Sequence, residues 1–512
     1  MSATSRTAAS EVPARRVAVV GGGWAGCAAA VALADAGAAV TVYEAARTLG
    51  GRARALDAHG RRLDNGQHIL LGAYADTLGL LRRVGIDARQ ALLRLPLQMR
   101  YPPAGARHAA DPQQPWMDFV APRLPAPLHM LAALLRAKGL ERADKLALAR
   151  FSTSARWMGW QLNDDCSVAE LLERFDQTAR LVRLMWRPLC LAALNTAPEH
   201  ASAQVFLAVL RDSLGARRAA SDMLLPRLLL DELFPQAARR HVEARGGRVL
   251  CGARVEALAQ DGALWRVQAC AMAAGAQPAS AAPSGPLPAA GVAPGAQAGA
   301  AAPSAPSTAA TYDAVVLATA PWQAAGLLRA LPGAAALADR LDAFAYEPIS
   351  TVYLQYEPAL RLPLPFCALL DEPERGAWGQ FVFDRGQLDP GQGGLLAVVI
   401  SGASAAAGLP RAALAEAVAR QLAHAFGVAA LARPAWHQVI SEKRATFACT
   451  PALDRPANAT GIAGLVLAGD YTASDYPATL ESAVRSGLQA ARLAGQPSGR
   501  QPAQPAGASV AA

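Results

Sequence analysis

The stretch LDNGQHILLGAY (residues 63–74) gathers side chains that could do acid–base chemistry. Asp64, Asn65, Gln67 and His68 bring one carboxylate, two amides and one imidazole into five residues. A histidine can give or take a proton near neutral pH, and carboxylates and amides can orient it. An apolar run follows at once, which a surface loop would not need. The polar residues 64–68 therefore lie where the chain enters the interior. The elements that precede them in the sequence must determine what they face there.

A glycine motif precedes this stretch and predicts a dinucleotide site. Gly21, Gly23 and Gly26 follow the expected strand 15–20 and open a helical pattern that ends near residue 37. Gly21 allows a tight turn, Gly23 lets backbone approach a pyrophosphate, and Gly26 lets helix and strand pack closely. Glu44 ends the next expected strand, about twenty residues on, where a carboxylate can bind ribose hydroxyls.

A second glycine pair follows in LGGRAR (residues 49–54). Gly51 can bring backbone against a cofactor, and Arg52 or Arg54 can pair with phosphate as a planar fork. A solvated loop is the alternative for the two arginines. This arrangement resembles the FAD-binding amine oxidase and phytoene desaturase superfamily, in which GGR-x-R follows the ribose-binding Glu.

The C-terminal stretch LVLAGDYTASDYPATLESAVRSG (residues 465–487) resembles the closing FAD motif of the same superfamily. The resemblance implies that Gly469 and Asp470 end a strand and that Asp470 binds the ribityl or pyrophosphate region. It also implies that a helix from about Pro477 points its N-terminus at the flavin. Val255 resembles a position whose backbone touches the adenine; a plain edge strand is the alternative.

Three stretches resemble the hydroxysqualene dehydroxylases, also described as squalene-associated FAD-dependent desaturases of hopanoid biosynthesis. They are DNGQHILLGAY, residues 187–215 (RPLCLAALNTAPEHASAQVFLAVLRDSLG) and residues 224–247 (LLPRLLLDELFPQAARRHVEARGG). With the closing FAD motif, the resemblance covers nearly the whole chain. It implies removal of an allylic hydroxyl from hydroxysqualene by FADH2, giving squalene, FAD and water.

Such a reaction needs a proton donor at the leaving oxygen and an apolar site that excludes water. We expect His68 as the donor, with Gln67 and Asp64 as its partners. Alternatively, Asp64 and Asn65 only hydrogen-bond the turn and His68 only packs against the flavin. Other donors within expected reach are Tyr471, Asp475 and Tyr476.

The expected fold class is α/β, with a Rossmann-like FAD-binding domain on a parallel sheet and an inserted α+β substrate domain. The FAD-binding domain is expected in three pieces, residues 1–76, 235–341 and 455–495. The substrate-binding domain is expected over 77–234, where the pattern is helical, and 342–454. Residues 271–311 are nearly all Ala, Pro, Gly and Ser, and we expect a disordered insertion there and a disordered tail over 496–512.

Composition limits the partners. The net charge is +9, yet no run of five basic residues occurs, which argues against nucleic acid. Seven cysteines are scattered along the chain and form no CxxC, which predicts reduced thiols and no metal site. No reductase domain and no cysteine spacing typical of an Fe–S cluster is evident, so we expect an external electron donor for the flavin. No signal peptide or membrane-spanning stretch is evident, so we expect a cytoplasmic protein. Residues 127–140, with Arg136 and Lys138, fit either a helix lying on the inner membrane face or an ordinary core helix.

The family resemblance also implies an isoprenoid substrate and a functional partnership with the synthases that form hydroxysqualene. Two other functions stay open. One is a carotenoid-type desaturase, in which oxidised FAD takes hydride from an allylic C–H. The other is a prenyl-binding module without flavin chemistry, against which the intact Glu44 and glycine motifs argue.

Overall fold

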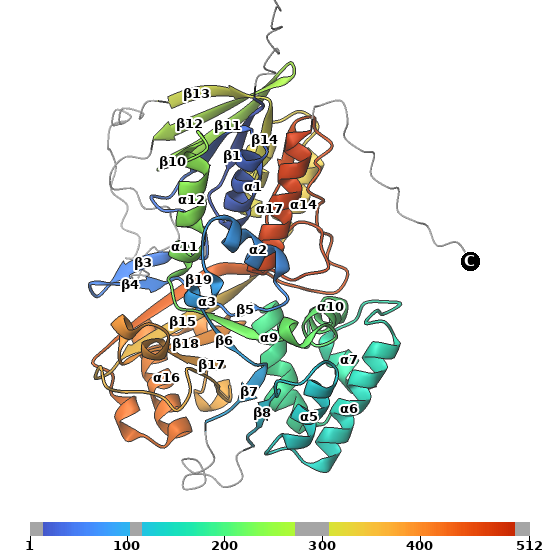
Figure 1. Cartoon of the computed structure of the whole chain (residues 1–512), viewed down its shortest axis with the longest axis vertical. Coiled ribbons are helices and arrows are strands. Elements are labelled where there is room, and N and C mark those ends of the chain that lie inside the picture. Colours follow the sequence, from blue (N-terminus) through green and yellow to red (C-terminus); the bar gives the residue numbers. More distant parts are fainter. Residues whose placement is uncertain (1–13, 103–114, 272–306, 497–512) are drawn as a thin grey trace, which may run out of the picture.

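The computed structural model describes residues 14–102, 115–271 and 307–496. Its upper half in Figure 1 holds a five-stranded sheet in the order β10-β2-β1-β14-β20, parallel throughout. The strands come from distant parts of the chain: β1 (Arg16–Val20), β2 (Ala39–Glu44), β10 (Arg248–Cys251), β14 (Ala314–Leu317) and β20 (Leu465–Leu467). The apolar residues of the inner strand β1 and all of β14 and β20 are buried, as a parallel sheet covered on both faces requires.

Helices and a second sheet cover the parallel sheet. Helices α12 (Pro235–Glu243), α1 (Trp24–Asp35) and α17 (Leu480–Gly495) lie side by side over it in Figure 1. A three-stranded antiparallel sheet of β11 (Ala253–Asp261), β12 (Leu264–Ala271) and β13 (Ser307–Tyr312) contacts β1, β2 and β14. The α/β fold class is confirmed.

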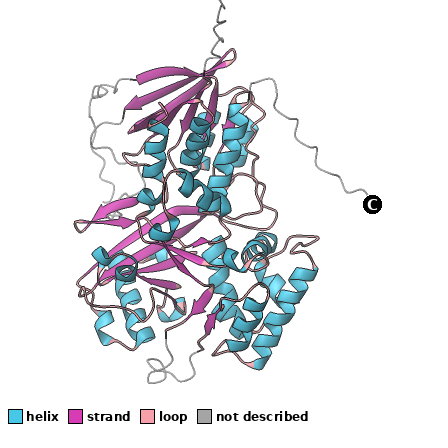
Figure 2. Ribbon diagram, viewed as in Figure 1, coloured by secondary structure: helices cyan, strands magenta, loops and turns pink. Residues whose placement is uncertain are grey.

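The lower half in Figure 2 combines a strand-rich part with a helix-rich part. An antiparallel sheet has the order β16-β17-β18-β15-β19, and α16 (Arg411–Phe426) packs on β15 and β19. The strands of that sheet are β15 (Tyr346–Gln355), β16 (Phe366–Ala368), β17 (Phe381–Asp384), β18 (Leu395–Ser401) and β19 (Trp436–Phe447). The helices beside it are α5 (Leu128–Arg136), α6 (Arg142–Trp157), α7 (Val168–Arg174), α8 (Ala179–Leu181), a π-helix (Val182–Trp186), α9 (Arg187–Leu194) and α10 (Ala203–Ser213).

The remaining elements are short. The small strands are β3 (Ala55–Ala58), β4 (Arg61–Asp64), β5 (Leu70–Leu71), β6 (Leu92–Leu95), β7 (Gln98–Arg100), β8 (Asp118–Val120) and β9 (Met223–Pro226). The remaining α-helices are α2 (Ala75–Arg83), α3 (Ala88–Ala91), α11 (Leu230–Leu233), α13 (Pro321–Leu328), α14 (Ala335–Asp342) and α15 (Arg385–Leu388). Single turns of 3₁₀-helix cover 218–220, 373–375, 390–392, 406–408 and 429–432. No helix of the described residues is long and apolar enough to cross a bilayer.

Several expectations need correction. The helical pattern over 77–234 also contains strands β6 to β9. Strand β9 pairs with β5 and β6, which are far away in sequence, and β7 pairs with β8. The expected disorder over 271–311 is wrong at its ends, because Ala271 closes β12 and Ser307–Tyr312 forms β13 antiparallel to β12. Residues 272–306 and 497–512 lie outside the described residues. The last helix begins at Leu480, not Pro477, because Thr479 and Ser482 form a capping box there. The division into two domains stays a prediction.

Helix α1 is buried on every side because small residues let two helices approach it closely. Its alanines contact α12 and α17, and it is almost entirely buried. Gly487 of α17 lies against the carbonyl oxygen of Ala25, which any Cβ on Gly487 would overlap. The packing of α17 on α1 therefore depends on the absence of a side chain at this position.

Gly487→Ala should push α17 away from α1 and destabilise the protein by about 1–3 kcal/mol. Gly495→Ala is the matched control, because a Cβ there meets nothing within 4 Å. Thermal unfolding of the two variants and the wild type measures the difference. Equal melting temperatures for both variants would contradict the close approach.

Candidate cofactor site and polar cluster

The turn after β1 is closed by backbone contacts that exclude side chains. Gly21 has φ +106° and donates its N–H to the carbonyl of Tyr43 at 2.8 Å. A Cβ on Gly21 would lie 2.5 Å from the carbonyl oxygen of Ala318. A Cβ on Gly26 would overlap the carbonyl oxygen of Gly21. The motif thus joins β1, β2, β14 and α1 at one tight point.

The second glycine segment reaches this turn. Gly50 donates its N–H to the carbonyl of Gly22 at 2.8 Å, and a Cβ on Gly51 would lie 3.2 Å from the Cα of Gly23. Gly23 also caps the start of α1, whose first turn holds no acidic residue. Bare backbone beside a helix N-terminus is what a diphosphate requires.

Glu44 lies at the other side of the same turn. Its carboxylate accepts hydrogen bonds from the N–H groups of Gly22 and Ala46, both at 2.7 Å. Burial raises the pKa of Glu44, and those two hydrogen bonds oppose the shift. Each oxygen keeps a further lone pair, so the carboxylate can still accept from ribose hydroxyls.

Arg52 and Asp470 meet across 418 residues of sequence. Arg52 Nη2 donates to Asp470 Oδ1 at 2.6 Å, and its Nη1 donates to the Ala445 carbonyl at 2.6 Å. Asn65 Nδ2 donates to the Arg52 carbonyl at 3.0 Å. The DNGQH stretch is therefore fixed directly to the GGR segment and, through Arg52, to the closing motif.

The other predicted cofactor residues occupy nearby or supporting positions. Arg54 Nη1 donates to the Gly51 carbonyl at 3.2 Å, and Gly469 N–H donates to Ser486 Oγ at 2.9 Å. Val255 is buried in β11, beside an irregularity in its pairing with β12. Its contact with adenine stays a prediction.

Four buried hydroxyl groups lack a hydrogen-bond partner among the described residues: those of Thr319, Tyr346, Thr351 and Tyr471. Thr319 follows the Ala318 that contacts Gly21, and Thr351 Oγ1 lies 3.9 Å from where a Cβ on Gly66 would be. Buried unpaired hydroxyls destabilise a fold unless a ligand or water satisfies them. Together with the glycine approach, they fit a bound FAD. Within the described ranges, no group of three His, Cys, Asp or Glu side chains could hold a metal ion.

Gln67 sits in a buried network that joins β4 to the antiparallel sheet. Its Nε2 donates to the hydroxyl of Tyr353 at 2.7 Å, and that hydroxyl donates to the carbonyl of Asp64 at 2.9 Å. Arg385 Nη1 donates to Gln67 Oε1 at 3.1 Å. The Asp64 carboxylate accepts from the N–H of Leu230 at 2.8 Å, so it holds the start of α11.

The environment shifts the pKa values of two members of the DNGQH stretch. Burial raises the pKa of Asp64 to about 6, opposed by the Arg385 charge and the Leu230 hydrogen bond. Burial lowers the pKa of His68, and the charge of Arg52 lowers it further, while a contact with the Gly66 carbonyl opposes the shift. The lowered pKa favours the neutral imidazole over its cation, and it makes the cation a better proton donor than the imidazolium of an exposed histidine.

Arg385 and Tyr353 were missed by the sequence interpretation. Arg385 is 2% exposed, and its Nη2 has no partner among the described residues. Arg385 is the first residue of α15 and directly follows the apolar strand β17. A charged residue immediately after an apolar strand is the one sequence feature that could have indicated a role for it. Two expected donors are engaged elsewhere: Tyr476 bonds to Asp212, and Asp475 lies 3.7 Å from Arg211.

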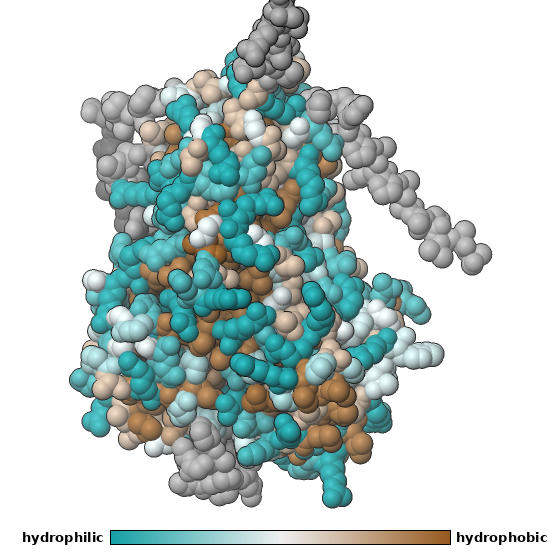
Figure 3. Space-filling model, viewed as in Figure 1, coloured by the Kyte–Doolittle hydropathy of each residue, from teal (hydrophilic) through white to brown (hydrophobic). Residues whose placement is uncertain are grey.

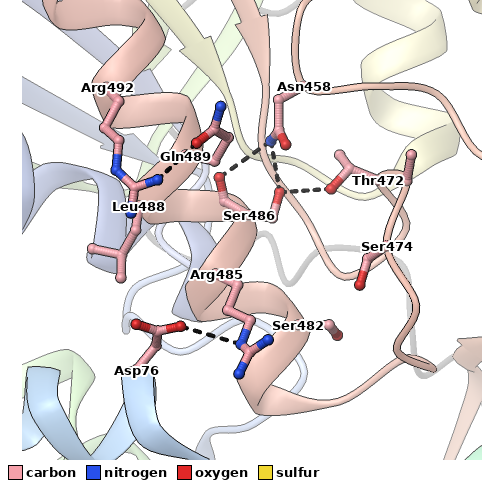
Figure 4. Close-up of a pocket in the computed structure, with 11 residues that line it drawn as sticks. Asp76, Asn458, Thr472, Ser474, Ser482, Arg485, Ser486, Leu488, Gln489 and Arg492 are labelled. Atoms are coloured by element: carbon pink, nitrogen blue, oxygen red, sulfur yellow. Dashed lines mark hydrogen bonds and ion pairs between the residues drawn. The ribbon is translucent and has the colours of Figure 1, made fainter. Parts of the chain in front are cut away.

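A separate pocket of about 290 Å³ lies beside α17. Figure 4 shows Arg485 pointing to Asp76 and Arg492 to Gln489, with Asn458 bonded to Ser486. Its polar groups largely pair with one another. None of the predicted site residues lines it, and we assign it no role.

The family model described as flavin containing amine oxidoreductase matches residues 24–281 and 295–494. The chain belongs to this family. A hydroxysqualene dehydroxylase of Rhodopseudomonas palustris is 29% identical over 94% of this chain and 98% of its own length. A zeta-carotene desaturase of Synechocystis is 26% identical over 93% and 96%. Cyclohexylamine oxidase from Brevibacterium oxydans shares the fold, with a TM-score of 0.60, 18% identity and coverage of 94% and 99%.

These matches establish that the protein is an FAD-dependent oxidoreductase, and the predicted cofactor is confirmed. The predicted resemblance to hydroxysqualene dehydroxylases is confirmed too. The roles of individual site residues stay predictions.

Asp64→Asn should make stability less sensitive to pH. The folded-state pKa is raised from 3.8 to about 6, so folding favours the protonated carboxyl. Its contribution is complete below about pH 4 and is lost as the pH rises through about 6, amounting to about 3 kcal/mol. The melting temperature of FAD-loaded Asp64→Asn, relative to wild type, should therefore increase across this window. Parallel curves for the two proteins would contradict the shift.

Proposed function

We propose that this oxidoreductase removes the hydroxyl group of hydroxysqualene reductively, giving squalene. The observation that carries the proposal is end-to-end similarity to enzymes named hydroxysqualene dehydroxylase, at 94% coverage of this chain. The partly buried DNGQH cluster supports it, because it sets polar groups beside the residues expected to hold FAD.

The reaction balances as the substrate alcohol plus reduced FAD giving the hydrocarbon, oxidised FAD and water. Bound reduced FAD would supply the hydride that replaces the hydroxyl at carbon. The protein must protonate the departing hydroxyl, so that water leaves as the C–O bond breaks. It must also hold the carbon chain in an apolar environment. Leu63 and Ile69, on either side of the polar stretch, pack in the same apolar cluster as Phe366, Phe381 and Met223.

His68 is the proposed proton donor. Its lowered pKa makes the imidazolium a better proton donor than that of an exposed histidine, and the hydrogen bond from Asn65 to the Arg52 carbonyl holds its loop beside the GGR segment. Gln67 and Asp64 act as its partners by fixing the loop: Gln67 through Tyr353 and Arg385, and Asp64 through Leu230. Arg385 is a positioning residue in this scheme, because its contact is with Gln67 and not with the reacting atoms.

The proposed reaction needs two other components, an electron donor and a source of substrate. The flavin must be reduced again by an external electron donor, and the substrate must come from synthases that form hydroxysqualene. Both rest on the proposed reaction.

A carotenoid-type desaturase is the second candidate, favoured by the 26% identity with the zeta-carotene desaturase over most of both chains. The two functions differ in the direction of electron flow. The dehydroxylase consumes reduced flavin, whereas the desaturase consumes oxidised flavin.

An anaerobic single turnover distinguishes them. Photoreduced protein, mixed with hydroxysqualene in detergent, should reoxidise its flavin and form squalene in equal amount. His68→Ala should slow this step by about 100-fold or more while keeping FAD, and exposed His437→Ala is the matched control. A flavin that stays reduced, in protein that desaturates an isoprenoid when oxidised, would overturn the proposal. Wild-type turnover in His68→Ala would remove His68 as the donor.

A further inference from the structure

Exposed apolar side chains are concentrated in one short part of the chain. Of the eight large hydrophobic residues exposed among the described residues, six lie between positions 124 and 157. We call them the α5–α6 patch: Leu124, Leu128, Leu131, Leu135, Leu146 and Trp157. Figure 3 shows apolar atoms gathered at the lower right, where Figure 1 places α5 and α6. Large grouped apolar exposure marks an interaction surface.

Three leucines of α5 form a stripe along the helix that is exposed to solvent and not packed in the core. Leu128, Leu131 and Leu135 follow helical spacing and are 53%, 53% and 67% exposed. His129 and Ala133, on the other side of the helix, are fully buried. Lys145 Nζ donates to the Leu135 carbonyl at 3.0 Å, which holds the start of α6 against the end of α5. The stripe therefore continues towards Leu146.

The α6 residues of the patch extend it. Leu146 is 66% exposed and Trp157 is 91% exposed, and positions 146, 150 and 157 lie along one side of the helix. Tryptophan is the side chain most favoured at a membrane–water boundary. An indole that is 91% exposed to water gains little from packing in the free protein.

The charge around the patch is strongly one-sided. Residues 123–157 contain seven Arg and Lys but only two Asp and Glu. Both acidic residues are engaged in the capping box of α6, and Asp144 is buried. The exposed basic side chains are Arg123, Arg136, Lys138, Arg142, Arg150 and Arg156.

We infer that the α5–α6 patch docks the protein on the surface of an anionic lipid bilayer. Leucines and tryptophan enter the boundary between headgroups and acyl chains, and the basic side chains contact anionic headgroups. A second copy of this chain fits less well, because a symmetric dimer would bring two like-charged rims together. The docking argument is independent of the proposed reaction. Only the purpose of docking, which is to take up an isoprenoid substrate from the bilayer, rests on the proposed function.

Flotation of FAD-loaded protein with vesicles tests the inference without any turnover. The wild type should float with vesicles of phosphatidylcholine and phosphatidylglycerol, and less with phosphatidylcholine alone or at high salt. The triple variant Leu128→Ser, Leu131→Ser and Leu135→Ser should bind at least about tenfold more weakly. Arg136→Glu with Lys138→Glu should lose about thirtyfold on the anionic vesicles only.

The matched control is Leu409→Ser with Val428→Ser, which removes two exposed apolar side chains away from the patch and should not change flotation. FAD content and melting temperature check that every variant is folded. Wild-type protein that does not float would overturn the inference, as would unchanged flotation of the triple leucine variant. A wild-type dimer that the leucine changes convert to a monomer, without vesicle binding, would assign the patch to a second copy. Single turnover in detergent does not depend on the bilayer, so failure of docking and failure of the proposed reaction are distinguishable.

Discussion

The close approach of two glycine segments at the end of β1 is the constraint on which the rest of the structure depends. The turn at Gly21–Gly26 contacts β14 through Ala318, and Gly51 comes against Gly23. Side chains at these points would separate the strands, the first helix and the GGR segment. Because the GGR segment runs directly into β3 and β4, this approach also sets where the DNGQH stretch lies. The cofactor site and the polar cluster therefore share one anchor.

The polar cluster is held in place by hydrogen bonds from distant elements. Tyr353 of β15 links Gln67 to the backbone of Asp64, and Arg385 comes from the end of β17. The backbone N–H of Leu230, in α11, donates a hydrogen bond to the Asp64 carboxylate. Burying a carboxylate, an amide and a guanidinium is costly unless each is paired. Such a set fixes the loop in one conformation, and the His68 side chain takes its orientation from that loop.

Sequence reasoning succeeded where the geometry is local. The glycine spacing, Glu44 and the Gly469–Asp470 pair each lie within one strand–turn–helix unit, so their geometry follows from neighbouring residues. Arg385 and Tyr353 could not be found that way, because their contacts with Gln67 depend on how the antiparallel sheet meets β4. Strand β13 was missed for another reason. Its sequence, STAATY, has the small-residue composition of the insertion before it, and only pairing with β12 makes it a strand.

The origin of the new C–H bond in the product is the most direct measure of the central claim, reductive dehydroxylation by flavin. Reduced protein would be equilibrated in D2O, mixed with hydroxysqualene without oxygen, and the product analysed by mass spectrometry. A flavin hydride exchanges with solvent, so the account predicts squalene that carries one deuterium per molecule. Squalene without deuterium, or a product that keeps its oxygen and has lost hydrogen, would contradict it.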